Sequence, residues 1–243
     1  MLFVEISETV RTVGPIGFFY IPITAIMAFS VLYKAIKLKQ KMLYIFFLTL
    51  LFTPTSWYPS QIGYIYWLFT QEALTYQTYV LMGTLGIPIA MLSWLYIYLT
   101  TIKTQLKKLV LSVYGIISIV FYVFLLYFLL IAPGAPIQNL IAIEKGPLDV
   151  DYQGIVLLYM IISVFTGVIS GIHFSIVSMR SDSKLILWKG RFLLMSFIAF
   201  GIGAFGDAII TLLIFRVFLL ISSVLFYIGF IMPNWMKRIL SLK

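Results

Sequence analysis

The chain has 243 residues, of which 62% are hydrophobic and 10% charged, and it carries a formal net charge of +9 with no cysteine. Charged residues make up about 25% of an average soluble protein, and a soluble fold of this length has too little interior for so much apolar surface. The lack of cysteine excludes disulfides, thiolate metal sites and c-type haem attachment. The composition therefore predicts an all-α, polytopic membrane protein.

Long apolar runs divide the chain into segments of about 20 residues, the length that a helix needs to cross a bilayer. The first run lacks the layout of a signal peptide, because Glu5 and Glu8 precede it, so we expect it to be retained as a helix. We predict one seven-helix transmembrane domain over residues 1–243. Its helices are expected at about 13–33, 42–58, 78–100, 109–132, 153–178, 192–211 and 213–232.

Two connections between the predicted helices are long, and one is very short. The second helix runs into an aromatic stretch, residues 58–69, which we expect at the membrane interface or as a helical extension above the membrane. Residues 133–152 form a longer loop that contains acidic side chains and the turn pair Gly146-Pro147. The last two helices must be joined by a tight turn near Arg216, because roughly 41 residues hold both crossings.

Basic residues lie almost entirely on alternate connections. Of the 17 Lys and Arg residues, all but Arg11, Lys145 and Arg216 follow the first, third, fifth or seventh helix. By the positive-inside rule, the amino terminus lies outside and the carboxyl terminus in the cytoplasm, as in a multi-pass protein of the cell membrane. The positive charge is spread over short loops, which favours contact with anionic membrane lipids and not with nucleic acid.

Prolines lie near the middle of each of the first three helices, where each removes a backbone donor and kinks its helix: Pro22, Pro54 and Pro88. One interpretation is that membrane helices tolerate proline. The other is a cavity that opens outward between these helices and suits an amphipathic or cationic small molecule. The residues expected to line it are Trp57, Tyr58, Tyr64, Trp67, Glu72 and Tyr79. An ordinary aromatic belt at the membrane interface explains the same residues.

Three ionisable side chains lie within the predicted membrane helices. Asp207 and Arg216 flank the tight turn, so they can form an ion pair that fastens two helix ends; a proton or cation site and simple exposure are the alternatives. His173 is the only histidine, and it is expected to pack between helices or to act as a pH-sensitive switch. A lone histidine excludes bis-histidine haem and disfavours zinc, so we predict no metal and no cofactor.

Small residues form two surfaces for close helix contact. Gly167 and Gly171 make a G-x-x-x-G pattern, and Gly203 belongs to a second small-residue surface on the sixth helix. Packing within the bundle is the simpler interpretation, and a homodimer interface is the alternative. The motifs of intramembrane serine and aspartyl proteases are broken, because Val168 and Ala204 replace their first glycines, and the last helix has no lysine for retinal. We therefore expect no enzymatic activity.

Two stretches point to a family. Residues 79–98 place a proline before an aromatic-rich inner half that includes Trp94 and Tyr98, and the sixth helix opens with Lys-Gly-Arg-Phe-Leu-Leu at 189–194, after a short basic loop. This pattern resembles the seven-helix sensory module that precedes histidine kinases and related signalling proteins in bacteria and archaea. We expect no output domain after the last helix, and in this respect the chain departs from that module. The resemblance implies a stand-alone sensor or receptor-like bundle, and it supplies no ligand residues.

These patterns favour a non-enzymatic membrane sensor or receptor-like module. It would bind a small amphipathic ligand or a partner in its outer half, shift the kinked helices against the straight ones, and signal through a separate polypeptide. A structural membrane subunit of a larger complex is the alternative, favoured by short loops and few polar membrane residues. A small-molecule transporter comes third, because we find no internal repeat and little intramembrane charge.

Overall fold

The computed structural model describes residues 14–132, 140–146, 148–210 and 212–242 of the chain. Within these ranges, six helices are long and apolar enough to cross a membrane, at residues 19–38, 76–101, 104–131, 154–179, 184–209 and 213–231. The protein is therefore an all-α, multi-pass membrane protein with one small hairpin beside the helices. Of the positions discussed above, Glu5, Glu8, Arg11, Pro147 and Thr211 lie outside the described residues.

The structure contains α-helices, short 3-10 and π-helical turns (η) and two strands. In chain order they are η1 (Gly14–Ile16), α2 (Gly17–Leu38), α3 (Lys41–Phe52), η2 (Thr53–Trp57), α4 (Tyr58–Thr70), α5 (Tyr76–Thr84), α6 (Gly86–Thr101), η3 (Thr104–Leu106), α7 (Lys107–Leu126), η4 (Tyr127–Ile131), β1 (Ala142–Gly146), β2 (Asp149–Tyr152), α9 (Gly154–Met179), α10 (Lys184–Ile209), α11 (Leu213–Ile231) and α12 (Asn234–Ile239).

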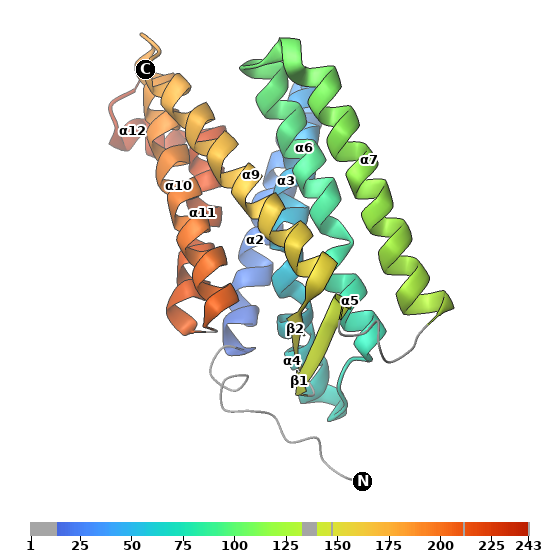
Figure 1. The fold of residues 1–243 in the computed structure, drawn as a ribbon. Coiled ribbons are helices and arrows are strands. Elements are labelled where there is room, and N and C mark those ends of the chain that lie inside the picture. Colours follow the sequence, from blue (N-terminus) through green and yellow to red (C-terminus); the bar gives the residue numbers. More distant parts are fainter. Residues whose placement is uncertain (1–13, 133–139, 147, 211, 243) are drawn as a thin grey trace.

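The long helices run side by side and form one bundle (Figure 1). α10 packs closely against α9 and α11, while α3 packs between α2 and α6. α7 lies on the flank of the bundle and contacts α6 more than any other long helix. α12 and the carboxyl terminus lie at one end, and the hairpin and α4 lie at the other. The two ends of the bundle are therefore built from different kinds of element.

Aromatic rings from five helices join the two sides of the bundle. Phe46 of α3 stacks on Phe230 of α11, with ring centroids 3.7 Å apart, and Trp94 of α6 lies 4.9 Å from Phe197 of α10 and 5.7 Å from Phe174 of α9. Each such pair contributes about 0.5–1.5 kcal/mol beyond its area burial. This aromatic cluster therefore packs together helices that are far apart in the sequence.

Small and polar side chains hold α10 against α11. The hydroxyl of Ser196 donates to the carbonyl of Ser222 over 2.8 Å, and the hydroxyl of Ser222 donates back to the carbonyl of Ser196 over 3.0 Å. A Cβ on Gly203 would lie 3.0 Å from the backbone carbonyl of Phe215, so the two helices approach too closely there for a larger residue. Gly203 therefore serves packing within the chain, as small residues commonly do between membrane helices.

The second hydrophobic segment is a broken helix that extends beyond the expected end at residue 58. α3 ends at Phe52, the 3-10 turn η2 begins with Thr53-Pro54, and α4 continues to Thr70. Pro54 lacks the N–H that would continue the α-helical ladder, and this explains the change of helix type. The segment stops at Gln71, which adopts the left-handed conformation at φ 60°.

Two further regions differ from the predicted boundaries. α10 begins at Lys184, before the expected start at Phe192, because lysine, leucine and arginine are good helix formers and a helix can continue into the head-group layer. Residues 142–152, expected as a loop, contain an antiparallel hairpin in which Ala142 pairs with Tyr152. Gly154 follows it at φ +50°, where a Cβ would lie 2.7 Å from the carbonyl oxygen of Leu140, so only glycine fits.

Candidate functional site

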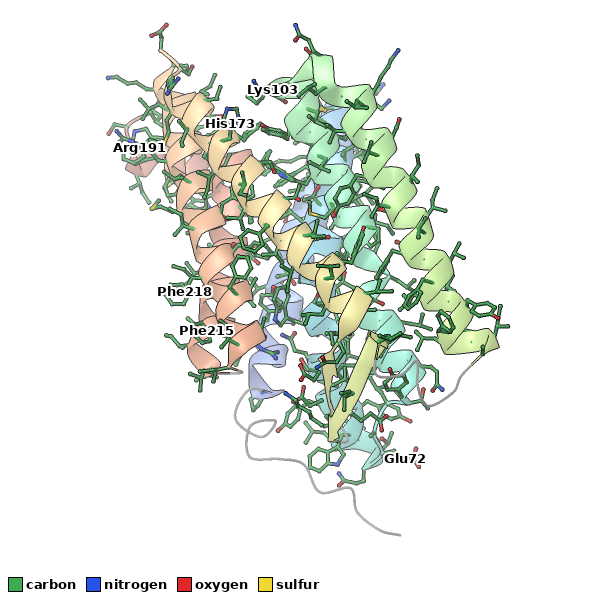
Figure 2. The ribbon with its side chains drawn as sticks, in the orientation of Figure 1. Glu72, Lys103, His173, Arg191, Phe215 and Phe218 are labelled. Carbon is green, nitrogen blue, oxygen red and sulfur yellow. The ribbon has the colours of Figure 1, made fainter. Side chains whose placement is uncertain are left out.

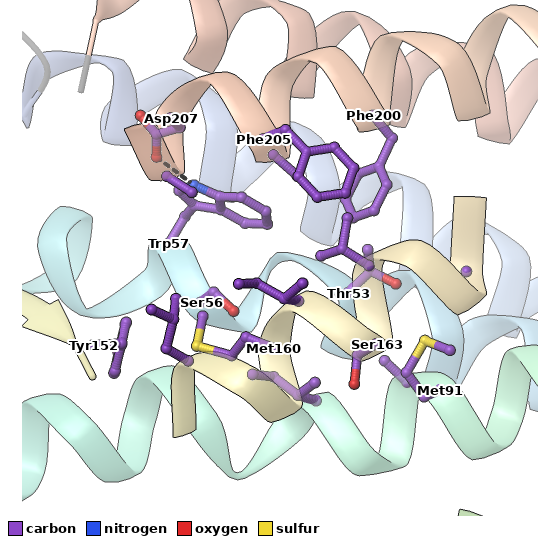
Figure 3. A pocket seen from close by; sticks show the side chains of 18 of the residues that line it. Thr53, Ser56, Trp57, Met91, Tyr152, Met160, Ser163, Phe200, Phe205 and Asp207 are labelled. Carbon is purple, nitrogen blue, oxygen red and sulfur yellow. Dashed lines mark hydrogen bonds between the residues drawn. The ribbon is translucent and has the colours of Figure 1, made fainter. Parts of the chain in front are cut away.

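A cavity of about 320 Å³ lies inside the bundle, at the end that carries the hairpin (Figure 3). Its walls come from α3, η2, α4, α5, α6, α9, α10, α11 and the hairpin. Much of the lining is apolar, and it includes Met91, Met160, Phe200 and Phe205. A volume of this size lies within the range of ordinary small-molecule sites, which are largely apolar with a few placed polar groups.

One end of the cavity is charged, and we call it the polar end. Its charged side chains come from the hairpin, the end of α10 and the beginning of α11: Lys145, Asp149, Asp151, Asp207 and Arg216. The tight turn between α10 and α11 brings the last two together, since α10 ends at Ile209 and α11 begins at Leu213. The cavity is therefore amphipathic along its length.

Asp207 and Arg216 form a buried ion pair at the polar end. The Nε of Arg216 lies 3.1 Å from Oδ1 of Asp207, and the two side chains are only 8% and 9% exposed, respectively. The other carboxylate oxygen, Oδ2, accepts a 2.7 Å hydrogen bond from Nε1 of Trp57, which Figure 3 shows as a dashed line. Nη1 of Arg216 donates to the hydroxyl of Ser60 over 3.0 Å. The pair thus fastens α10 and α11 to η2 and α4.

The hairpin supplies a second, exposed ion pair and one further carboxylate. Lys145 lies 3.0 Å from Asp151, with side chains 59% and 41% exposed. Asp149 lines the cavity, as do both ion pairs. Burial raises the pKa of the Asp149 carboxyl above its usual value, while the positive charges of Lys145 and Arg216 oppose that shift. Among the described residues, no side chain forms an ion pair with Asp149.

Tyr152 closes the cavity beside Asp149. Its hydroxyl is buried and has no hydrogen-bond partner among the described residues, although a buried hydroxyl ordinarily has one. The hydroxyl lies directly against Gly83, where an added Cβ would come within 1.9 Å of it. Gly83 therefore leaves the space that the Tyr152 ring occupies, and the hairpin is fitted against α5.

α9 and α10 separate toward the hairpin. They touch where Gly171 faces the ring of Phe197, and again where Phe165 lies 4.7 Å from Phe205. Beyond these contacts α9 runs diagonally away from α10 toward the hairpin (Figure 1). Ile161 of α9 and Ile209 of α10 both line the cavity, and Ile209 is 81% exposed. The lining of the cavity therefore reaches the surface of the protein at the end of α10.

The structure brings only some of the sequence-predicted ligand residues to this cavity. Trp57 and Tyr79 line it. The other four lie outside the lining: Tyr58 donates to the carbonyl of Leu51, Tyr64 and Trp67 stack with centroids 6.1 Å apart, and Glu72 is exposed beside Tyr66.

The prolines, glycines and histidine have varied surroundings. Pro22 lies inside the continuous helix α2, and Pro88 lies in the first turn of α6 after the break at Leu85. Gly167 lines the cavity, whereas Gly171 accommodates Phe197. The Nδ1 atom of His173 lies 3.0 Å from the hydroxyl of Tyr98, away from the cavity.

Sequence reasoning missed the hairpin carboxylates and the inner wall. The Asp-Val-Asp alternation at 149–151, after a Gly-Pro turn, was a signal for a strand with both carboxylates on one face. The inner residues Met91, Met160, Phe200 and Phe205 carry no local signal, because such residues are common in any membrane helix. Within the described ranges, no group of three or more His, Asp or Glu side chains is placed to hold a metal ion.

Comparison of the chain with protein-family models, with curated proteins and with solved structures finds no match.

Proposed function

We propose that the protein is a seven-span membrane sensor or receptor-like module whose cavity binds a small amphipathic molecule. In this proposal the broken segment α3–η2–α4 crosses the membrane as well as the six long helices. It has 30 residues from Lys41 to Thr70, which at 1.5 Å per residue reach about 45 Å, more than the roughly 30 Å hydrocarbon core. An odd number of crossings places the two termini on opposite sides of the cell membrane.

The distribution of charge supports an orientation with the hairpin outside. Lys103 and Arg191 lie at the end of the bundle that carries the carboxyl terminus, and Glu72 lies at the other end (Figure 2). The positive-inside rule puts the first end in the cytoplasm. The cavity then opens in the outer half of the membrane, where a molecule can reach it from the outside or from the outer leaflet.

The observation that carries the proposal is the amphipathic cavity itself. Its walls are parts of helices that continue to the basic end of the bundle, above all α9 and α10. A ligand that fits one arrangement of these helices better than another shifts the population toward that arrangement. The basic ends of the helices then present a changed surface to a partner polypeptide, which receives the signal.

The experiment tests whether the protein binds a small molecule saturably without transporting it. The full chain is placed in lipid nanodiscs and titrated by calorimetry with three matched aromatic probes: benzyltrimethylammonium, benzyl alcohol and phenylmethanesulfonate. Ala208→Trp adds an indole to the exposed part of the cavity lining, and Ile202→Trp is the matched control, since Ile202 is also exposed on the same helix but lies outside the lining. The proposal requires that at least one probe binds, that Ala208→Trp abolishes its binding, and that Ile202→Trp does not. Counterflow of the bound probe in proteoliposomes would instead indicate a transporter.

A structural membrane subunit is the second candidate, and the flank of α7 favours it. This helix exposes large apolar side chains around much of its surface, including Leu109, Ile116, Val120 and Val123, all more than 60% exposed. Such a face suits either lipid or another membrane protein. The mass of the particle after gentle extraction distinguishes the two, because a subunit travels with stoichiometric partners.

A further inference from the structure

The charges at the polar end point to the chemistry of the ligand. We infer that the cavity selects a monocationic amphiphile, with its positive group beside Asp149 and its apolar part among the inner aromatic and methionine side chains. This inference rests on the proposed function, because it names the ligand class of the same cavity.

The two ion pairs involve four of the five charged side chains at the polar end. Arg216 is engaged by Asp207, and Lys145 is engaged by Asp151. Three acidic and two basic side chains line the polar end, so its formal charge is −1 when all are ionised. Asp149 is the acid that neither pair uses. A cation that enters there neutralises the site, whereas an anion would meet an uncompensated carboxylate.

Each of the two cations at the polar end already lies against a carboxylate. Nε of Arg216 donates to Asp207 and its Nη1 donates to Ser60. An anion at the remaining N–H groups of Arg216 or Lys145 would take the formal charge of the polar end from about −1 to −2, because each cation already lies against a carboxylate. The titratable groups around Asp149 are Lys145 and Asp151 on the hairpin, Asp207 on α10, Arg216 on α11, and the tyrosines Tyr79 and Tyr152.

The aromatic and methionine side chains of the lining suit the apolar part of such a ligand, and the aromatic faces also attract its positive charge. Phe200 lies edge-on to Trp57 with ring centroids 6.2 Å apart, and Figure 3 labels both rings among the side chains that line the cavity. The indole of Trp57 is held in place by its hydrogen bond to Asp207. Aromatic faces attract ammonium groups most strongly when they are desolvated, and methionines such as Met91 and Met160 adapt to ligand shape. A cavity of about 320 Å³ has room for one substituted ring and a quaternary ammonium group.

The test uses the full chain in nanodiscs of zwitterionic lipid and the same three probes, which share a benzyl group and differ in charge. We expect benzyltrimethylammonium to bind at least tenfold more tightly than benzyl alcohol, and phenylmethanesulfonate to bind most weakly. Asp149→Asn should lower the affinity for benzyltrimethylammonium about tenfold and leave the affinity for benzyl alcohol unchanged. Lys145→Gln should raise the affinity for benzyltrimethylammonium or leave it unchanged, because the substitution removes a positive charge from the polar end.

Glu144→Gln is the matched control. Glu144 is exposed on the same hairpin and does not line the cavity, yet it removes the same charge as Asp149→Asn. It should leave all three affinities unchanged. An equal loss in both variants would mean that the cation senses the general surface charge and would overturn the inference. Thermal midpoints of both variants, measured beside the affinities, separate a loss of binding from a loss of fold.

Failure of this inference differs from failure of the proposed function. If benzyl alcohol or phenylmethanesulfonate binds as tightly as the cation, and Ala208→Trp still blocks it, the cation preference is wrong and the ligand-binding function stands. If no probe binds, both are contradicted. A fall in cation affinity on acidification, present in the native chain and absent in Asp149→Asn, would independently support the inference.

Discussion

The indole Nε1 of Trp57 donates a 2.7 Å hydrogen bond to Oδ2 of Asp207, which lies 150 positions further along the chain. This contact joins the 3-10 turn in the second hydrophobic segment to the end of α10. Because Oδ1 of the same carboxylate bonds to Arg216, one acidic side chain ties three separate parts of the bundle together at the cavity wall. Asp207 therefore combines a structural role with a place in the lining of the candidate site.

Removal of Asp207 should leave a buried charge without a partner. Asp207→Asn is expected to lower the free energy of unfolding by about 3–5 kcal/mol, because Arg216 is almost fully buried and loses its counter-ion. Asp151→Asn is the control, since its ion pair with Lys145 is exposed and contributes only about 0–1 kcal/mol. Denaturant unfolding in mild detergent measures both. Equal losses of unfolding free energy in the two variants would show that the buried pair stabilises the fold no more than the exposed pair does.

Exchange of the two charges should recover only part of that stability. The double variant Asp207→Arg with Arg216→Asp restores opposite charges at the same two positions. The indole N–H of Trp57 would then face a guanidinium group, which accepts no hydrogen bond. We therefore expect the double variant to unfold between the native chain and the worse of the two single reversals. A double variant no better than either single reversal would argue against direct pairing.

Trp57→Phe removes the hydrogen bond to Asp207 but keeps an aromatic ring at position 57. The phenyl ring keeps much of the apolar contact with Phe200, but Oδ2 of Asp207 loses its donor in a buried place. The free energy of unfolding is expected to fall by about 1–3 kcal/mol, the usual cost of leaving a buried polar group without a hydrogen bond. Trp235→Phe serves as control because Trp235 is half exposed on α12. The comparison uses thermal unfolding followed by circular dichroism.

Gly154→Ala should displace the hairpin. Residue 154 has φ +50°, which costs an alanine roughly 1–2 kcal/mol, and the added Cβ would collide with the backbone of Leu140. Gly115→Ala is the matched control, because no atom lies within 4 Å of the added Cβ and alanine favours the helix. We expect the first variant to lose stability and probe binding together, and the second to lose neither. Intact binding in Gly154→Ala would mean that the hairpin does not shape the cavity.

Acidification should favour the folded state through Asp149. Its pKa is raised in the fold, so the folded chain binds a proton more readily than the unfolded chain. The contribution of this group to stability therefore falls as pH rises through the interval between the ordinary and the raised pKa. Asp149→Asn should remove that component and increase stability at neutral pH. The difference between the unfolding midpoints of native and variant chains, recorded against pH, isolates this group from other titrations.

The membrane topology has a direct test because the chain contains no cysteine. Single cysteines at Lys39, Glu72 and Asp182, all exposed positions, can be labelled with a membrane-impermeant maleimide on intact cells. If α3–η2–α4 crosses the membrane, the cysteine at 72 reacts from outside, and those at 39 and 182 react only after lysis. Labelling of positions 39 and 72 from the same side would contradict the seventh crossing.

Much of the helical framework follows from local sequence. Apolar runs such as 154–179 and 213–231 coincide closely with predicted segments, because in a bilayer every backbone polar group must be satisfied within a helix. Predicted and observed boundaries differ where a helix continues past the apolar run. Lys184 and Lys189 lie in α10, although they precede the predicted helix start at residue 192, since hydropathy marks where the membrane ends and not where the helix ends.

The sequence by itself determined that this is a helical membrane protein, and it pointed to Asp207 and Arg216 as residues that can pair. Only the tertiary structure decided that Trp57 bonds to this carboxylate, that Asp149 faces the cavity, and that Tyr64, Trp67 and Glu72 do not. The physical reason is that helix formation in a membrane depends on local backbone hydrogen bonding. The lining of a cavity depends instead on which faces of distant helices meet, and in apolar helices nearly every face looks alike in sequence.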